Sequence, residues 1–181
     1  MPSAPLVTLV GNPRPASRTR IAAEQVAVDL AAHFPGAATE SVTIDLATLG
    51  PAAVGAADPP PTSAAAQAIR AATQARVLVV ATPVYKASFT GLLKLFLDQL
   101  HPGALDGVIA VPVTIAAAPT HTLLADLHLR PVLAELGASL PVPSLTLTEK
   151  ELPNLVALSE AWAARFAPAV RALVTEAEVR A

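Results

Sequence analysis

The 181-residue sequence contains no cysteine, 3% aromatic residues and only 14% charged residues. The absence of cysteine excludes disulfides, thiolate metal sites and a cysteine nucleophile. The net charge of −2 provides no field to attract nucleic acid or an anionic membrane. No apolar run reaches the roughly 18–20 residues that span a bilayer, and no secretory leader is visible. We therefore expect a cytoplasmic protein with no nucleic-acid or membrane partner.

Hydrophobic residues, in contrast, make up 53% of the chain. A chain of this length can bury a sizeable core in one domain, which we expect to cover residues 1–181. With so few charges, we expect part of the surface to be covered by another subunit.

Strand-like apolar segments alternate with segments of helical period, which predicts an α/β sheet. The predicted strands cover residues 5–11, 41–46, 76–82, 108–115 and 140–147. The predicted helices cover residues 19–34, 63–75, 88–100, 121–136 and 153–176, and residues 50–62 form the only long loop. Five such units predict a flavodoxin-like five-stranded parallel sheet of order 2-1-3-4-5, with helices on both faces.

The third strand is apolar throughout residues 77–81, which is typical of a central strand covered on both faces.

Two prolines fall inside predicted elements. Pro112 is awkward in the fourth strand, because proline lacks a ladder donor and prefers edges or bulges. Pro131 cannot donate to the carbonyl of Leu127, so the helix over residues 121–136 should kink or bulge near that residue.

The segment after the first strand has the composition of an anion-binding loop. Residues 11–19 read Gly-Asn-Pro-Arg-Pro-Ala-Ser-Arg-Thr. Ser17 and Thr19 supply hydroxyls, Arg14 and Arg18 supply guanidinium groups, and the following helix supplies free N–H groups. In the alternative interpretation, Ser17 only caps the helix and the arginines are solvated. Two cations at a helix N-terminus are electrostatically disfavoured, which favours a bound phosphate.

A second loop follows the third strand, at the edge where open α/β sheets bind ligands. Residues 83–86 read Pro-Val-Tyr-Lys. Their backbone groups suit hydrogen bonds to the polar edge of a planar ring. The side chains of Val84 and Tyr85 suit packing against its face. Alternatively, Tyr85 and Lys86 are ordinary surface residues. Together the two loops describe a site for a phosphorylated planar ligand, and flavin mononucleotide (FMN) is the best candidate.

The helix predicted over residues 88–100 carries leucine or phenylalanine around most of its circumference. Such a helix is usually buried on two sides. We therefore expect it to pack on its own sheet and on a symmetry mate, which predicts at least a dimer. Lys94 and Asp98, four residues apart, are expected to pair within the helix or across that interface.

The two loops in combination resemble the NADPH-dependent FMN reductase family, particularly the flavin-supplying partners of two-component alkanesulfonate-type monooxygenases. The matching segments are residues 11–14, 17–19, 81–86, 91–98, 121–124 and 129–133. The resemblance implies a flavodoxin-like homodimer or homotetramer that transfers a hydride from NADPH or NADH to FMN and supplies reduced flavin to a partner monooxygenase. The implied phosphate ligands are Asn12, Arg14, Ser17, Arg18 and Thr19, and the implied ring contacts are Pro83, Val84, Tyr85 and Lys86.

Hydride transfer requires no protein nucleophile or general acid, because the two cofactors carry the chemistry. The protein must instead stabilise the negative charge that develops on the ring. We expect this from backbone N–H groups of residues 115–118, including Ala116 and Ala117, and from the ammonium group of Lys86. No histidine spacing indicates a metal site.

One departure concerns these alanines, because the family usually has a Gly-Gly pair there. Residues 115–120 read Ile-Ala-Ala-Ala-Pro-Thr. Alanine keeps its N–H, but a positive φ would be costly and the added methyl groups would crowd the ring. We therefore expect altered flavin affinity or ring orientation.

Three alternatives remain open at this point. The first is an enzyme that keeps FMN bound and reduces a quinone, an azo dye or a metal ion. The second is a flavodoxin-like electron carrier, which the net charge of −2 and the single Tyr and Trp disfavour. The third is a non-catalytic binding module, since the glycine pair is absent.

Overall fold

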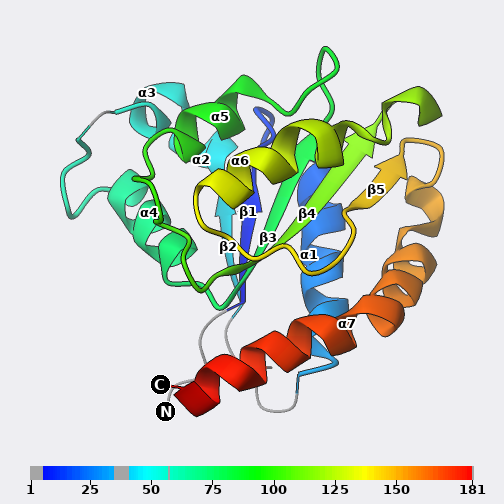
Figure 1. Ribbon diagram of the computed structural model, residues 1–181. Helices are drawn as coiled ribbons and strands as arrows, with labels where there is room; N and C mark the ends of the chain where they lie inside the picture. The colour runs from blue at the N-terminus through cyan, green and yellow to red at the C-terminus, as the bar shows by residue number, and fades with distance from the viewer. Residues whose placement is uncertain (1–5, 35–40, 57, 181) are drawn as a thin grey trace.

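A computed structural model describes residues 6–34, 41–56 and 58–180 (Figure 1). Its five strands form one parallel sheet in the order β2-β1-β3-β4-β5, which confirms the predicted topology. The strands are β1 (Leu6–Val10), β2 (Ser41–Asp45), β3 (Val77–Pro83), β4 (Ile109–Ala116) and β5 (Leu145–Thr148). The predicted first residue of the first strand, Pro5, lies outside the described residues.

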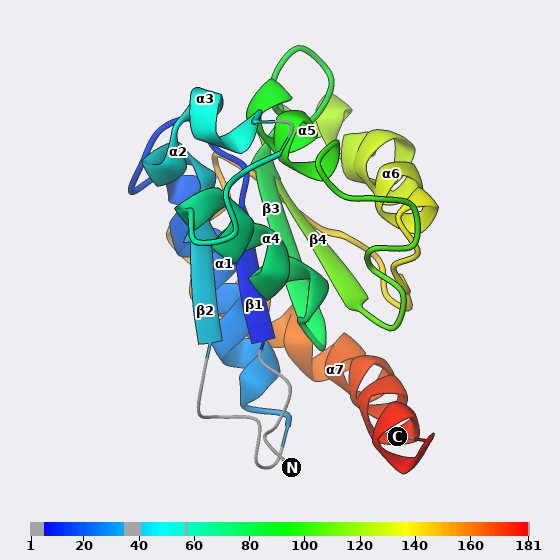
Figure 2. The ribbon, with the colours of Figure 1, turned by 90° about the vertical axis from the view of Figure 1, so that its left-hand side faces the viewer.

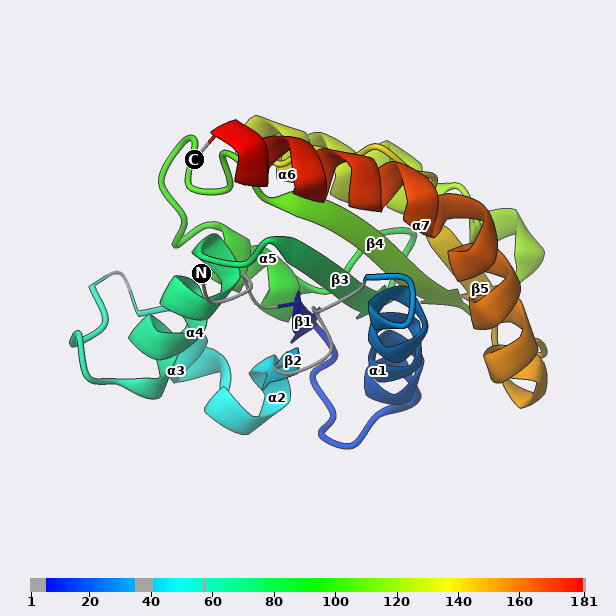
Figure 3. The ribbon, with the colours of Figure 1, turned by 90° about the horizontal axis from the view of Figure 1, so that it is seen from below.

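Helices cover both faces of this sheet. The α-helices are α1 (Arg18–Ala31), α2 (Leu46–Leu49), α3 (Pro51–Val54), α4 (Ala64–Thr73), α5 (Gly91–Leu97), α6 (Arg130–Glu135) and α7 (Leu155–Arg180). Short 3₁₀ segments cover Pro119–His121 and Leu152–Asn154. Helix α4 crosses the face opposite to α1 (Figure 2), and α1 packs beside α7 (Figure 3).

The strand residues divide between two hydrophobic clusters by the period-two alternation of β-structure. In β3, Val77, Val79 and Ala81 join α1 and α7 in one cluster. Leu78 and Val80 join the helices of the opposite face in the other cluster. All residues of β3 are buried, as predicted for the central strand. This double burial holds the carboxyl ends of β1, β3 and β4 at one edge of the sheet.

The segment predicted as the only long loop is partly helical, which corrects that prediction. Helix α3 occupies its beginning, directly after α2, Pro51 stands at the first helical position of α3, and Val54 is 2% exposed. Proline with its fixed φ suits that position. Hydrophobic periodicity missed these helices because each has only four residues.

Helix α5 is shorter than predicted, beginning at Gly91 with Thr90 as its N-cap. Its apolar residues, apart from the partly exposed Leu95, lie in the core cluster that also contains Val54 of α3. The sheet and α3 of the same chain therefore provide the predicted burial on two sides. The apolar character of this helix gives no evidence for or against a second subunit. Lys94 Nζ and Asp98 Oδ1 pair within the helix at 2.5 Å.

Strand β5 is also shorter than the predicted residues 140–147. The Arg130 guanidinium donates to the carbonyl oxygens of Leu140 and Val142, at 2.9 and 2.7 Å. These two carbonyl oxygens therefore form their hydrogen bonds with Arg130 and not with β4. Of the predicted residues 140–147, only those from Leu145 onward pair with β4.

This interruption explains how Pro112 is tolerated in β4, an inner strand. Ala110 donates to Ser139 on the β5 side, and residues two apart in a strand point the same way. Pro112 would therefore donate toward β5, but the regular pairing with β5 begins only at Val113 and Leu145. The missing donor falls where the neighbouring strand is absent.

The helix predicted over residues 121–136 is irregular at the place where Pro131 predicts it. A π-helical turn covers Ala125–Leu129, and regular α6 follows. The cause is the missing N–H of Pro131, which prevents an α-type bond to the carbonyl of Leu127. None of the helices in the described ranges is both long and apolar enough to cross a membrane.

Candidate active site

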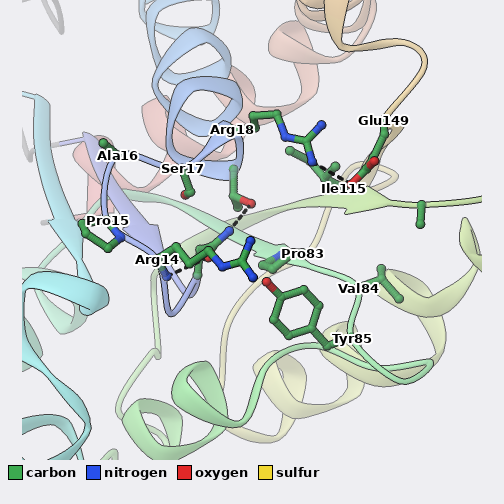
Figure 4. Close-up of a pocket in the computed structure, with 13 residues that line it drawn as sticks. Arg14, Pro15, Ala16, Ser17, Arg18, Pro83, Val84, Tyr85, Ile115 and Glu149 are labelled. Atoms are coloured by element: carbon green, nitrogen blue, oxygen red, sulfur yellow. Dashed lines mark hydrogen bonds and ion pairs between the residues drawn. The ribbon is translucent and has the colours of Figure 1, made fainter.

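A cavity of about 570 Å³ lies at the carboxyl edge of the sheet, where the loops after β1, β3, β4 and β5 meet. Its volume is in the range of small-molecule sites. The lining residues are Asn12, Arg14, Pro15, Ala16, Ser17, Arg18, Thr19, Pro83, Val84, Tyr85, Ile115, Ala117 and Glu149 (Figure 4). The two predicted loops thus face one cavity, whereas the predicted Lys86 and Ala116 are not among its lining residues.

The first loop, residues 11–19, is held by hydrogen bonds of its own. The buried Asn12 donates from Nδ2 to Thr19 Oγ1 at 2.9 Å, and Asn12 Oδ1 accepts from the Arg14 N–H at 2.9 Å. The Asn12 amide therefore spans the loop and closes it on the first turn of α1. Its polar atoms serve to shape the loop.

The hydroxyls of this loop keep donors for a ligand. Ser17 caps α1 by accepting from the Arg20 N–H at 3.2 Å, and Thr19 Oγ1 accepts from Asn12. Each hydroxyl can accept and also donate, so each retains its hydrogen. Ala16 has φ +50°, which turns the chain into the helix. Hydroxyls and the free N–H groups of the first helical turn together favour an anion.

The two arginines of the first loop differ in their partners. Arg18 Nη2 lies 2.7 Å from Glu149 Oε1, with both side chains about half exposed. Arg14 forms no ion pair with any carboxylate in the described residues, and its guanidinium points toward the Tyr85 hydroxyl (Figure 4). Sequence reasoning missed Glu149, although it directly follows β5 and so stands at the ligand-binding edge.

The second loop, residues 83–88, contains a tight turn. The N–H groups of Tyr85 and Ser88 each donate to the other residue's carbonyl, at 2.8 and 3.0 Å. Lys86 and Ala87 between them have φ of +49° and +64°, the pattern of a type I′ turn that usually requires Gly or Asn. Val84 donates to the Ile115 carbonyl at 2.8 Å. The Val84 and Tyr85 N–H groups are therefore occupied, and the exposed Tyr85 ring stands beside the cavity.

The third loop, residues 115–118, is not strained by its alanines. Positive φ occurs at none of its residues, and Ala118 has φ −140°. The alanines therefore carry no cost from positive φ, and the altered flavin affinity or ring orientation stays a prediction. Ala116 is buried, and its carbonyl accepts from the Glu149 N–H at 3.0 Å. Ala117 lines the cavity, and its N–H donates to no protein group in the described part of the chain.

A buried polar link ties the first two loops together. The Thr90 hydroxyl donates to the Gly11 carbonyl and accepts from the Leu93 N–H, and the Thr90 N–H donates to Thr82 Oγ1 at 3.2 Å. Gly11 is required here, because an added Cβ would lie 2.6 Å from Leu93 Cβ. Sequence reasoning missed Thr90, which a helix starting at Gly91 identifies as an N-cap.

The family model described as NADPH-dependent FMN reductase matches residues 5–151, which include all four loops around the cavity. The chain belongs to the NADPH-dependent FMN reductase family. This membership confirms the resemblance that the loop residues indicated.

Individual relatives of this family agree. The NADH-dependent FMN reductase SfnF of Pseudomonas fluorescens (strain Pf0-1) is 33% identical over 169 residues, 89% of this chain and 85% of that protein. The FMN reductase (NADPH) of Escherichia coli (strain K12) is 46% identical over 65 residues. That match spans 36% of this chain and about a third of the length of the E. coli protein. The solved apo structure of an NADH:FMN oxidoreductase (EMOB) aligns with a TM-score of 0.80 and 31% identity, covering 96% of this chain and 89% of that one.

Proposed function

We propose that this protein is an NAD(P)H-dependent FMN reductase that supplies reduced flavin to a partner monooxygenase. One observation carries the proposal: the same cavity joins the N-terminus of α1, with the hydroxyls and arginines of the first loop, to a space beside an exposed tyrosine ring. FMN combines a phosphate and a planar ring in one molecule. Family membership independently supports this assignment.

The phosphate would lie in the first loop. The free donors are the hydroxyls of Ser17 and Thr19, the N–H groups of the first turn of α1 other than that of Arg20, and the Arg14 guanidinium. Charge-assisted hydrogen bonds of this kind are the strong ones. Asn12 would act by holding the loop in the shape that lets these donors converge.

The ring would lie between the second and third loops, against Pro83, Val84 and Tyr85. Bound FMN would accept a hydride from the nicotinamide of NADH or NADPH. The N–H of Ala117 is directed to no protein acceptor among the described residues, so it is available to stabilise charge on the ring. Ala116 would support that loop from its buried position, and the ammonium of Lys86 would act electrostatically from the neighbouring turn.

Release of the reduced flavin is consistent with the exposure of the site. Arg18 and Glu149 side chains are 62% and 48% exposed, and Tyr85 is 42% exposed. Because these lining side chains are exposed, the cavity opens to solvent, which suits a ligand that dissociates. A flavin that dissociates can be passed to a separate monooxygenase.

Association into a homodimer or homotetramer is supported by two exposed leucines, one just before and one within the π-helical turn. Leu123 and Leu127 are 66% and 64% exposed and lie four residues apart. Contiguous exposed apolar side chains mark interaction surfaces. Leu127→Glu should therefore lower the oligomeric state measured by analytical ultracentrifugation, whereas Val156→Glu, at another exposed apolar position, should not.

The direct test is oxidation of NADH and of NADPH, followed by the loss of nicotinamide absorbance with and without added FMN. The proposal expects oxidation that depends on added FMN and flavin that leaves the protein on gel filtration. Protein that retains FMN and reduces a quinone in ping-pong fashion would indicate the tightly bound alternative. A folded protein with no FMN-dependent oxidation would contradict the proposal.

A further inference from the structure

The cavity contains one carboxylate among its cations, and the proposed reaction gives that carboxylate no role. Glu149 lines the same cavity as Arg14 and Arg18. Its Oε1 lies 2.7 Å from Arg18 Nη2, and the two residues are 131 positions apart in the chain. With one negative and two positive side chains, the cavity walls carry one net positive charge.

A phosphate dianion entering the first loop would find one of the two guanidinium groups already paired with this carboxylate. Two anions that share one guanidinium oppose each other, and the opposition is strongest at low ionic strength.

We infer that Glu149 is an affinity-determining residue: its carboxylate competes with the flavin phosphate for Arg18 and keeps FMN binding weak enough for release. The inference rests on the proposed function. It assigns to this chain an anion that competes with the ligand's own phosphate, supplied by the loop after β5.

The backbone around Glu149 is fixed, so the carboxylate is held in reach of Arg18. The Glu149 N–H donates to the Ala116 carbonyl at 3.0 Å. Two residues on, Glu151 Oε2 accepts from both the N–H and the hydroxyl of Thr148, at 2.7 Å each. The turn that follows β5 is therefore closed on both sides of Glu149.

The Arg18–Glu149 pair itself is exchangeable. Both side chains are about half exposed, and exposed ion pairs typically contribute less than about 1 kcal/mol. Another ion pair of the same helix, Arg20 with Asp45, involves a carboxylate that is only 4% exposed. Glu149 can therefore release Arg18 to a ligand at little cost. This suits a residue that competes with the ligand and not one that stabilises the fold.

The test compares FMN with riboflavin, which has the same ring and no phosphate. Binding is measured by flavin fluorescence for the wild type and for Glu149→Gln, a substitution that keeps the shape and removes the charge. We expect roughly two- to fivefold tighter FMN binding at low ionic strength and unchanged riboflavin binding. Near molar salt, where the Debye length is about 3 Å, the difference should disappear.

The matched control is Asp98→Asn, which removes one negative charge from the exposed Lys94–Asp98 pair outside the cavity. FMN affinity should not change in that variant. In an Arg18→Ala background, Glu149→Gln should change FMN affinity by less than about twofold, because the shared partner is gone.

Several outcomes would overturn the inference. Glu149→Gln that leaves FMN affinity unchanged, or shifts FMN and riboflavin equally, would show that the carboxylate does not oppose the phosphate. A full effect in the Arg18→Ala background would contradict competition for Arg18. Failure of the wild type to bind FMN would instead contradict the proposed function, and the inference with it.

Discussion

The two loops that face the cavity are stabilised in opposite ways. The first loop, residues 11–19, is closed by the Asn12 side chain and capped by Ser17, and Ala16 is its one residue with positive φ. The second loop, residues 83–88, reverses at Lys86 and Ala87, both in left-handed conformations that disfavour a side chain. The first loop is held mainly by side-chain hydrogen bonds, whereas the second combines the backbone hydrogen bonds of its turn with two consecutive strained residues.

This difference corresponds to the proposed roles of the loops. A phosphate requires several donors at fixed positions, and a hydrogen-bonded loop provides them before the ligand arrives. A ring face requires mainly a surface, and a tight turn that presents Tyr85 suffices. Strained backbone of this kind clusters at ligand sites. The following predictions test the contrast between the loops.

The largest effect is expected at Arg14. Arg14→Ala removes a guanidinium that is in no ion pair within the described residues, and it should weaken FMN binding about ten- to a hundredfold, because hydrogen bonds to charged groups contribute about 1.5–3 kcal/mol. Riboflavin binding should stay within about twofold. Fluorescence titration measures both, with Arg171→Ala on α7 as the control for charge. An equal loss of affinity for FMN and for riboflavin would mean that the phosphate does not bind in the first loop.

Next comes Gly11, at the start of the first loop. Gly11→Ala places a methyl group 2.6 Å from Leu93 Cβ and should lower the free energy of unfolding by about 1–3 kcal/mol, because packed cores resist added volume. Urea denaturation measures the change. Gly91→Ala is the matched control, since an added Cβ there meets nothing within 4 Å. Equal stability of the two variants would contradict the close approach of β1 and α5.

Thr90 joins the two loops and should affect both. Thr90→Val removes the N-cap of α5 and the bond to the Gly11 carbonyl, which should lower the free energy of unfolding by about 1–2 kcal/mol and weaken FMN binding. Ser63→Ala removes the corresponding cap of α4. It should lower stability by about 1 kcal/mol and leave FMN affinity unchanged. Denaturation and titration of both variants separate the link between the loops from simple capping.

The strain of the second loop predicts a gain in stability. Lys86→Gly and Ala87→Gly should each raise the free energy of unfolding by about 0.5–1 kcal/mol, because relief of the left-handed conformation exceeds the added chain entropy of glycine. Ala134→Gly, on an exposed face of α6, should lower stability by up to about 1 kcal/mol. Loss of stability in the two loop variants would mean that the turn carries no strain.

The smallest effect concerns Glu151, beside the turn that carries Glu149. Hydrogen bonds from the Thr148 N–H and hydroxyl lower the pKa of Glu151. A carboxyl whose pKa is lower in the folded state stabilises the protein at neutral pH, and this contribution disappears as the pH falls through the lowered pKa. Glu151→Gln should therefore reduce stability slightly at neutral pH and not at strongly acidic pH. Thermal unfolding at both pH values measures the difference, with Glu160→Gln as the control.

Sequence patterns predicted the features that depend on local rules. Continuous apolarity placed β3 at the centre of the sheet, and the missing N–H of Pro131 predicted a kink or bulge near Leu127, where the π-helical turn Ala125–Leu129 lies. The first loop could be identified as a candidate anion site because hydroxyls and arginines just before a helix N-terminus favour negative charge. Each of these rules acts within a few residues of the chain.

Other features escaped prediction because they depend on distant contacts. Helix α3 is too short to have a hydrophobic period, yet its Val54 covers α5 and removes the argument for a second subunit at that helix. The sequence did not show where the backbone takes a positive φ: residues 115–118 have none, whereas Ala16, Lys86 and Ala87 do. Backbone conformation there follows from the packing of neighbouring loops.

The amino-acid sequence by itself determined the order of the five strands, the central position of β3 and the two loops that lie at the carboxyl edge, because alternation, capping and proline chemistry are local. Only the tertiary structure decided that Glu149 faces Arg18 and that Thr90 bonds to Gly11. These partners are far apart in the chain, and only the close packing of parallel strand ends brings them together.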